Sequence, residues 1–136
     1  MKKIIIVLFL LSSNLLFAQK APYNVVFDVT SSDTVVHQMV MRWIGEIVQF
    51  DPKANIEVVF YAKSIGMVSK DKSVVADEVM KYAASGNVKF TVCEVAMKRN
   101  NIEKGHLLKG VETVPDGIYE IISKQHEGWG YIKAAR

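Results

Sequence analysis

Three valine-rich runs, separated by helix-length segments, constrain this chain more than any other feature of its sequence. They occupy residues 23–29, 56–61 and 88–92. The first two runs are mostly apolar without strict alternation, which is typical of strands buried on both faces of a sheet, and the third is a short run that leads to the only cysteine. Because a helix between two such strands forms a right-handed parallel crossover, the chain is expected to be an α/β protein.

Two amphipathic helices are predicted between these strands. The first begins at Thr34 after an N-cap at Asp33 or Ser32, and its apolar pairs recur every four residues until residues 51–52 (Asp-Pro) end it. Its apolar stripe is wide enough to cover a sheet and reach a second surface, so a subunit contact is the alternative to plain core. The second helix follows Ser73, its predicted cap, and stops before the third strand.

Shorter elements are expected after the third strand. A helical turn is predicted at 95–98, a buried loop at 107–111 and a short strand at 112–114. Residues 129–132 are extended and aromatic, which suits an edge strand or an interface between subunits. The whole chain therefore supplies about five strands.

A last helix is predicted between the fourth and fifth strands. It follows residues 115–116 (Pro-Asp), a turn that includes an N-cap. Three isoleucines, Ile118, Ile121 and Ile122, are expected to face the core from this helix. Gly128 is expected to end it.

The N-terminus has the pattern of a secretory signal peptide. Residues 1–3 (Met-Lys-Lys) are basic, residues 4–11 are continuously apolar, and Ala18 supplies the small residue expected at a cleavage point. An uncleaved anchor is the alternative, but the apolar run is interrupted and falls short of the roughly 20 residues that span a bilayer. The prediction is a signal peptide at 1–18 and one domain at 19–136, periplasmic or secreted, with no membrane attachment after cleavage.

Charge and motif content argue against several classes of function. Loss of Lys2 and Lys3 lowers the formal charge by two from +3, so no nucleic-acid partner is expected. The turn at 30–32 (Thr-Ser-Ser) lacks the glycines of a phosphate-binding loop, and helix capping is the better interpretation. The three histidines lie on different predicted elements, so neither a metal site nor a bound cofactor is expected.

The only cysteine, Cys93, follows the third strand directly and is the best functional clue. A residue between the end of a strand and the start of a helix lies at the carboxyl edge of the sheet, where open α/β folds bind their ligands. Unpaired N–H groups, the positive helix end and the nearby cation Arg99 favour a thiolate, whereas Glu94 opposes one. The alternative is an inert, buried cysteine that acts as a small hydrophobe.

Several segments together resemble the DsrE/DsrF-like family. They are the strand at 25–29, the strand that ends at Cys93, residues 106–111 (His-Leu-Leu-Lys-Gly-Val), and the C-terminal part from Pro-Asp-Gly at 115–117 to Glu-Gly-Trp-Gly-Tyr-Ile-Lys at 127–133. The resemblance covers essentially the whole of residues 19–136. It implies a three-layer α/β/α sandwich around a mostly parallel sheet, assembled into homotrimers or hexamers.

The resemblance also implies a function for Cys93, which matches the position of the family's cysteine after the third core strand. The best-known members of the family carry sulfur as a cysteine persulfide. The expected function is therefore sulfur trafficking on Cys93, with Arg99 as a candidate thiolate stabiliser and a sulfur donor or acceptor protein as partner. The alternative is a non-catalytic, homo-oligomeric binding or accessory protein of the cell envelope with a structural Cys93.

Overall fold

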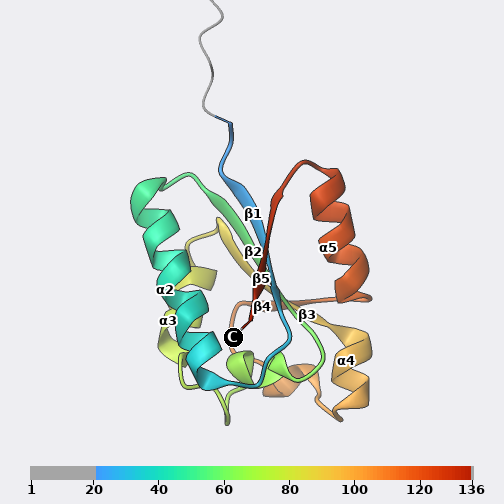
Figure 1. Ribbon diagram of the computed structural model, residues 1–136. Helices are drawn as coiled ribbons and strands as arrows, with labels where there is room; N and C mark the ends of the chain where they lie inside the picture. The colour runs from blue at the N-terminus through green and yellow to red at the C-terminus, as the bar shows by residue number, and fades with distance from the viewer. Residues whose placement is uncertain (1–20, 136) are drawn as a thin grey trace, which may run out of the picture.

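The computed structural model describes residues 21–135, in which five parallel strands form one sheet between two layers of helices (Figure 1). The predicted α/β/α sandwich is confirmed. The predicted signal peptide at 1–18 lies outside the described residues. Within residues 21–135, no helix is both long enough and apolar enough to span a bilayer.

The sheet has the strand order β4-β3-β2-β1-β5, and every neighbouring pair is parallel. The three valine-rich runs form its three interior strands, as the nearly continuous apolar character of the first two predicts. The shorter strands β4 and β5 take the two edges. The bounds are β1 Asn24–Val29, β2 Asn55–Phe60, β3 Val88–Cys93, β4 Val111–Val114 and β5 Gly130–Ala134.

Helices cover both faces of the sheet. The longer helix α2, Thr34–Phe50, lies with α3, Ala76–Ala83, on one face, while α4, Glu94–Arg99, and α5, Gly117–His126, lie on the other (Figure 1). Two short 3-10 helices, η2 Ser64–Val68 and η3 Lys104–His106, lie in the connections.

Aspartates begin the two helices for which the sequence predicts an acidic cap. Asp33 caps α2 and accepts a hydrogen bond from the Val35 amide at 2.9 Å, which decides between the two predicted caps. Asp116 likewise caps α5. The predicted cap of α3, Ser73, is wrong. The helix begins at Ala76 with Val75 at its N-cap, and the Ser73 hydroxyl accepts a hydrogen bond from the Val75 amide, which lies before the helix.

The apolar core is unequal on the two faces. A large cluster contains the apolar side chains of α2 and α3 together with Ala96 and Met97 of α4, and it surrounds stacked aromatic pairs such as Phe60 and Phe90, whose ring centroids lie 6.3 Å apart. On the α5 face the buried cluster contains only Val26, Val59 and Ile121. Since burial of one such side chain stabilises by about 1.5–3 kcal/mol, α5 is held by much less apolar contact than α2.

Two of the three isoleucines predicted to face the core from α5 do not. Ile121 is buried, whereas Ile118 is 55% and Ile122 is 56% exposed. The sheet contacts one narrow face of the helix, which contains Gly117, Ile121 and Lys124 at helical spacing. Ile118 and Ile122 lie on the adjoining face, which is open to solvent in the described part of the chain.

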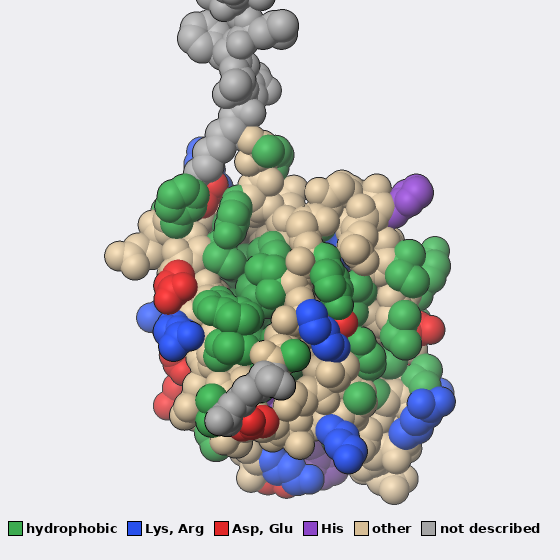
Figure 2. Space-filling model, viewed as in Figure 1, with side chains coloured by type: hydrophobic (Ala, Val, Ile, Leu, Met, Phe, Trp, Pro, Cys, Tyr) green, Lys and Arg blue, Asp and Glu red, His purple; other side chains and the backbone are tan. Residues whose placement is uncertain are grey.

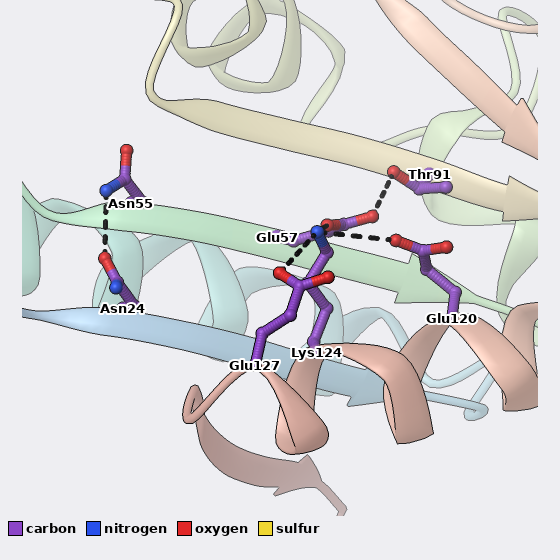
Figure 3. Close-up of polar contacts among 7 residues, drawn as sticks. All are labelled: Asn24, Asn55, Glu57, Thr91, Glu120, Lys124 and Glu127. Carbon is purple, nitrogen blue, oxygen red and sulfur yellow. Dashed lines mark hydrogen bonds and ion pairs between the residues drawn. The ribbon is translucent and has the colours of Figure 1, made fainter.

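Polar contacts hold α5 to the sheet where apolar contact is limited. Figure 3 shows the carboxylate of Glu57, a buried β2 residue, accepting a hydrogen bond from the Thr91 hydroxyl at 2.9 Å. The ammonium of Lys124 lies 3.6 Å from Glu57 and also contacts Glu120 and Glu127. A separate bond between the amides of residues 55 and 24 joins the starts of β2 and β1 (Figure 3).

Burial and the neighbouring charges shift the pKa values of both partners of this ion pair. Burial raises the pKa of Glu57, against the opposing effect of its hydrogen bond from Thr91. Burial also acts to lower the pKa of Lys124, but the surrounding carboxylates raise it overall. The polar network therefore fixes the position of α5 at a cost in desolvation.

Candidate functional site

Cys93 is the last residue of β3 and the N-cap of α4, at the carboxyl edge of the sheet where the sequence places it. Its side chain makes no capping hydrogen bond to α4 and is only 5% exposed. The residue lines a cavity of about 390 Å³ on the α4 and α5 side. The other lining residues are Tyr61, Ala62, Val95, Ala96, Arg99, Asn100, Asp116 and Ile118.

The first turn of α5 lies directly against Cys93. A Cβ atom on Gly117 would lie 2.9 Å from the Cβ of Cys93 and 3.2 Å from a methyl of Val59. Such approaches are shorter than the 3.5–4.0 Å optimum for carbon atoms, so only glycine fits. Sequence reasoning missed this role, although the Pro-Asp-Gly signal at 115–117 marks the place where the helix begins.

The C-terminal end of α4 forms another wall of the cavity. Asn100 donates hydrogen bonds to the carbonyl oxygens of Ala96 at 2.7 Å and Ala62 at 3.0 Å, which ties α4 to the loop after β2. Arg99 lies on the same wall, and none of the ion pairs among residues 21–135 includes its guanidinium. The structure thus brings Arg99 and Cys93, the two predicted site residues, to one cavity.

Glu94, predicted to oppose a thiolate, points toward other partners. Its carboxylate accepts a hydrogen bond from the Thr113 hydroxyl at 2.9 Å and pairs with Lys104 at 3.4 Å. The Thr113 hydrogen bond, followed by Lys104, lowers the pKa of Glu94. Glu94 and Lys104 pair with each other away from the cavity, so Arg99 is the cation among the described residues that line it.

A buried carboxylate beside this cavity was not recognised from the sequence. Asp28, near the carboxyl end of β1, is 5% exposed and accepts hydrogen bonds from the Tyr131 hydroxyl at 2.7 Å and the Lys133 ammonium at 2.9 Å. Lys133 also donates to the Thr30 hydroxyl at 3.0 Å. The sequence did contain a sign of this cluster: Asp28 is the one charged residue in a valine-rich strand, and a charge that is buried requires partners.

Tyr61 connects the Asp28 cluster to the Cys93 cavity. It follows β2 directly, lines the cavity, and has the Lys133 ammonium 5.6 Å from its ring centroid. Burial, followed by hydrogen bonding to Asp28 and the charge of Asp28, raises the pKa of Tyr61, and negative charge on Cys93 contributes in the same direction. The hydrogen bond to Asp28 raises the pKa of Tyr131 to about 12. Both phenols are therefore protonated at neutral pH.

The backbone next to Tyr61 is strained. Ala62 has a φ of 56°, in the left-handed region that residues with a Cβ rarely adopt. Its carbonyl is the one held by Asn100. Strain of this kind costs about 1–3 kcal/mol and is concentrated at functional sites, which supports this edge of the sheet as the site.

The histidines do not form a metal centre. His37 is buried, with its Nε2 atom 2.9 Å from the carbonyl oxygen of Ser31, as expected of a satisfied histidine. Among residues 21–135 no group of three His, Cys, Asp or Glu side chains is arranged to hold a metal ion.

The chain is thus a parallel α/β sandwich with a single thiol at the carboxyl edge of its sheet, where Cys93 lines a cavity. The chain belongs to the DsrE/DsrF-like family, whose model matches residues 17–134. Among the curated proteins, no sequence matches the chain significantly.

Solved structures share the fold. The chain is similar to MTH1491, a protein of unknown function from Methanobacterium thermoautotrophicum, with 26% identity and a TM-score of 0.76, over 82% of this chain and 98% of that one. It is also similar to the ychN protein from E. coli, with 10% identity and a TM-score of 0.69 over 82% and 98% of the two chains. A third similar structure is that of BT1422, a conserved protein of unknown function from Bacteroides thetaiotaomicron. It has 14% sequence identity and a TM-score of 0.65, over 82% of this chain and 94% of that one.

Proposed function

We propose that this protein traffics sulfur by carrying it as a persulfide on Cys93. The observation that carries the proposal is the cavity, which is lined by the thiol, by the protonated phenol of Tyr61 and by the Arg99 guanidinium, for which residues 21–135 offer no ion-pair partner. Membership of the DsrE/DsrF-like family supports a role of the sulfur-relay type.

The reaction needs no cofactor. The Cys93 thiolate attacks the outer sulfur of a sulfane donor such as thiosulfate, the donor's sulfur–sulfur bond breaks, and sulfite leaves with its electron pair. A thiolate of the acceptor protein then attacks the outer sulfur of the Cys93 persulfide, which releases the Cys93 thiolate again. Arg99 stabilises the thiolate and attracts the anionic donor.

Export and assembly belong to the same proposal. The protein is proposed to act in the periplasm or outside the cell, after removal of residues 1–18, as a homotrimer or hexamer. Exposed apolar side chains support assembly: Figure 2 shows hydrophobic side chains gathered along α5 and in the hollow beside α2. The large apolar side chains of α4, α5 and β5 with high exposed fractions are Val95, Ile118, Tyr119, Ile122 and Tyr131.

Mass spectrometry tests the proposal. Purified protein is treated with thiosulfate or polysulfide, desalted and digested, and the peptide that contains Cys93 is expected to gain the mass of one sulfur atom. Cys93→Ser serves as the control and gains none. A wild-type protein that stays unmodified under both donors contradicts the proposal.

The second candidate is a non-catalytic oligomeric accessory protein of the envelope with a structural cysteine. The low exposure of Cys93 favours it, because only an accessible sulfur can exchange. If iodoacetamide labels Cys93 only after denaturation, this second function is the better account.

A further inference from the structure

We propose that Tyr61 is a catalytic residue of this site, whose hydroxyl donates a hydrogen bond to the Cys93 sulfur when that sulfur is negatively charged. Asp28 and Lys133 act through Tyr61 as positioning residues. The sulfur-transfer part of the inference rests on the function proposed above, whereas the contact between Tyr61 and the thiolate can be tested without it.

Strand register places Tyr61 next to Cys93. Phe60 of β2 pairs with Val92 of β3, so the next residues along the two strands, Tyr61 and Cys93, are neighbours. The two residues line the same cavity, and the charge of Cys93 is among the causes that raise the pKa of Tyr61, so their side chains lie near each other. Adjacent strands are about 4.8 Å apart and paired residues project to the same face, so the tyrosine ring and the thiol share one side of the sheet.

The Asp28 cluster leaves the Tyr61 proton available. Asp28 acts on Tyr61 through a hydrogen bond as well as through its charge, but the same carboxylate also accepts hydrogen bonds from Tyr131 at 2.7 Å and from Lys133 at 2.9 Å. Asp28 is therefore satisfied when Tyr61 turns its proton toward the sulfur. Burial and the neighbouring Asp28 raise the pKa of Tyr61, so the phenol stays a neutral donor across the physiological range.

The other charged residues near Cys93 either lie on a different wall of the cavity from Tyr61 or have their own hydrogen-bond and ion-pair partners. Arg99 lies on the cavity wall formed by α4, and Asp116 at the start of α5 uses its carboxylate to accept the Ile118 and Tyr119 amides. Glu94 is paired with Lys104 outside the cavity. Of the described residues that line the cavity, Tyr61 alone carries a hydroxyl group.

The hydrogen bond assists the step in which sulfur leaves. When the acceptor thiolate attacks the outer sulfur of the persulfide, the bond between the two sulfurs breaks and its electron pair stays on the Cys93 sulfur. A hydrogen bond from Tyr61 to this leaving thiolate is charge-assisted and forms at full strength only as the bond breaks. The proton remains on the tyrosine, and no oxidant or reductant is consumed.

The test compares the rate of Cys93 alkylation by iodoacetamide, over a range of pH, in the wild type and in Tyr61→Phe. The variant is expected to react about tenfold more slowly at neutral pH, the size of effect expected when a hydrogen bond to a charged group is lost. The two rates converge at high pH, where the thiolate forms without assistance. Tyr119→Phe, an exposed tyrosine outside the cavity, is the matched control and leaves the profile unchanged.

Either of two results overturns the inference. An unchanged pH profile in Tyr61→Phe excludes the contact, and a rate that rises equally at every pH shows that the tyrosine only shields the thiol. Thermal unfolding checks that the variant is folded. If it is not, Tyr61→Gln, which keeps a neutral donor, is compared with Tyr61→Leu and is expected to react faster at neutral pH.

A second measurement separates this inference from the function on which it rests. Protein loaded with sulfur is mixed with free cysteine as acceptor, and Tyr61→Phe is expected to release its sulfur about tenfold more slowly than the wild type. Equal release rates overturn the catalytic role. Wild-type protein that takes up no sulfur contradicts the proposed function, while the alkylation profile still decides the contact.

Discussion

Replacement of Gly117 by alanine is expected to destabilise the protein and expose its thiol. The new Cβ would lie 2.9 Å from the Cβ of Cys93 and 3.2 Å from a Val59 methyl, and both neighbours belong to interior strands that cannot easily move. Overpacking of this kind costs about 1–3 kcal/mol. The helical preference of alanine over glycine returns about 0.5–1 kcal/mol, so the expected net loss in unfolding free energy is about 1 kcal/mol and at most about 2.5 kcal/mol.

Urea unfolding measures this loss, and iodoacetamide labelling measures its local effect. Because the small apolar cluster holds α5 weakly, the strain is expected to lift its first turn and speed alkylation of Cys93 at every pH. Gly105→Ala is the matched control, since a Cβ there meets nothing within 4 Å. A Gly117→Ala protein as stable as the wild type, with unchanged labelling, refutes the close approach of α5 to the thiol.

Four further outcomes are expected. Arg99→Ala is expected to slow the alkylation of Cys93 severalfold at neutral pH, because a nearby cation is lost. Glu94→Gln is expected to change the rate little, because this side chain lies outside the cavity. Equal effects of the two substitutions would contradict the geometry. The unfolding free energy is expected to fall as the pH rises from 10 toward 12, because the folded protein keeps the protons of Tyr61 and Tyr131 after the unfolded chain has lost them at the ordinary tyrosine pKa of 10.0. Tyr131→Phe flattens this decline. A decline of unchanged slope in that variant would refute the assignment. Light scattering at micromolar concentration gives the mass of a trimer or hexamer, and a monomer mass would exclude the assembly. Sequencing of the exported protein starts near Gln19, and an intact N-terminus in the membrane fraction would exclude cleavage.

The interior strands and the position of Cys93 were predictable from the sequence because burial on both faces leaves a local pattern. The runs that became β1 and β2 are apolar at most positions, and the shorter run of β3 ends at the cysteine. The outward position of Ile118 and Ile122 on α5 was not predictable, since helical periodicity does not say how wide a face the sheet covers.

The Asp28 cluster was beyond local reasoning for a different reason. Its members Asp28, Tyr61, Tyr131 and Lys133 come from three strands or their ends, and they meet because β5 returns to pair with β1. The register of Asp28 against Lys133 follows from that long-range pairing alone. No spacing within a single segment encodes it.

The most direct test of the central claim is the amount of sulfur that Cys93 takes up and passes on. After reaction with thiosulfate and removal of excess donor, mass spectrometry of the intact protein is expected to show up to one added sulfur atom per chain. Free cysteine then removes it and restores the original mass, while Cys93→Ser shows no change at either step. Wild-type protein that gains no sulfur, or gains it equally in Cys93→Ser, contradicts the role of this thiol as a persulfide carrier.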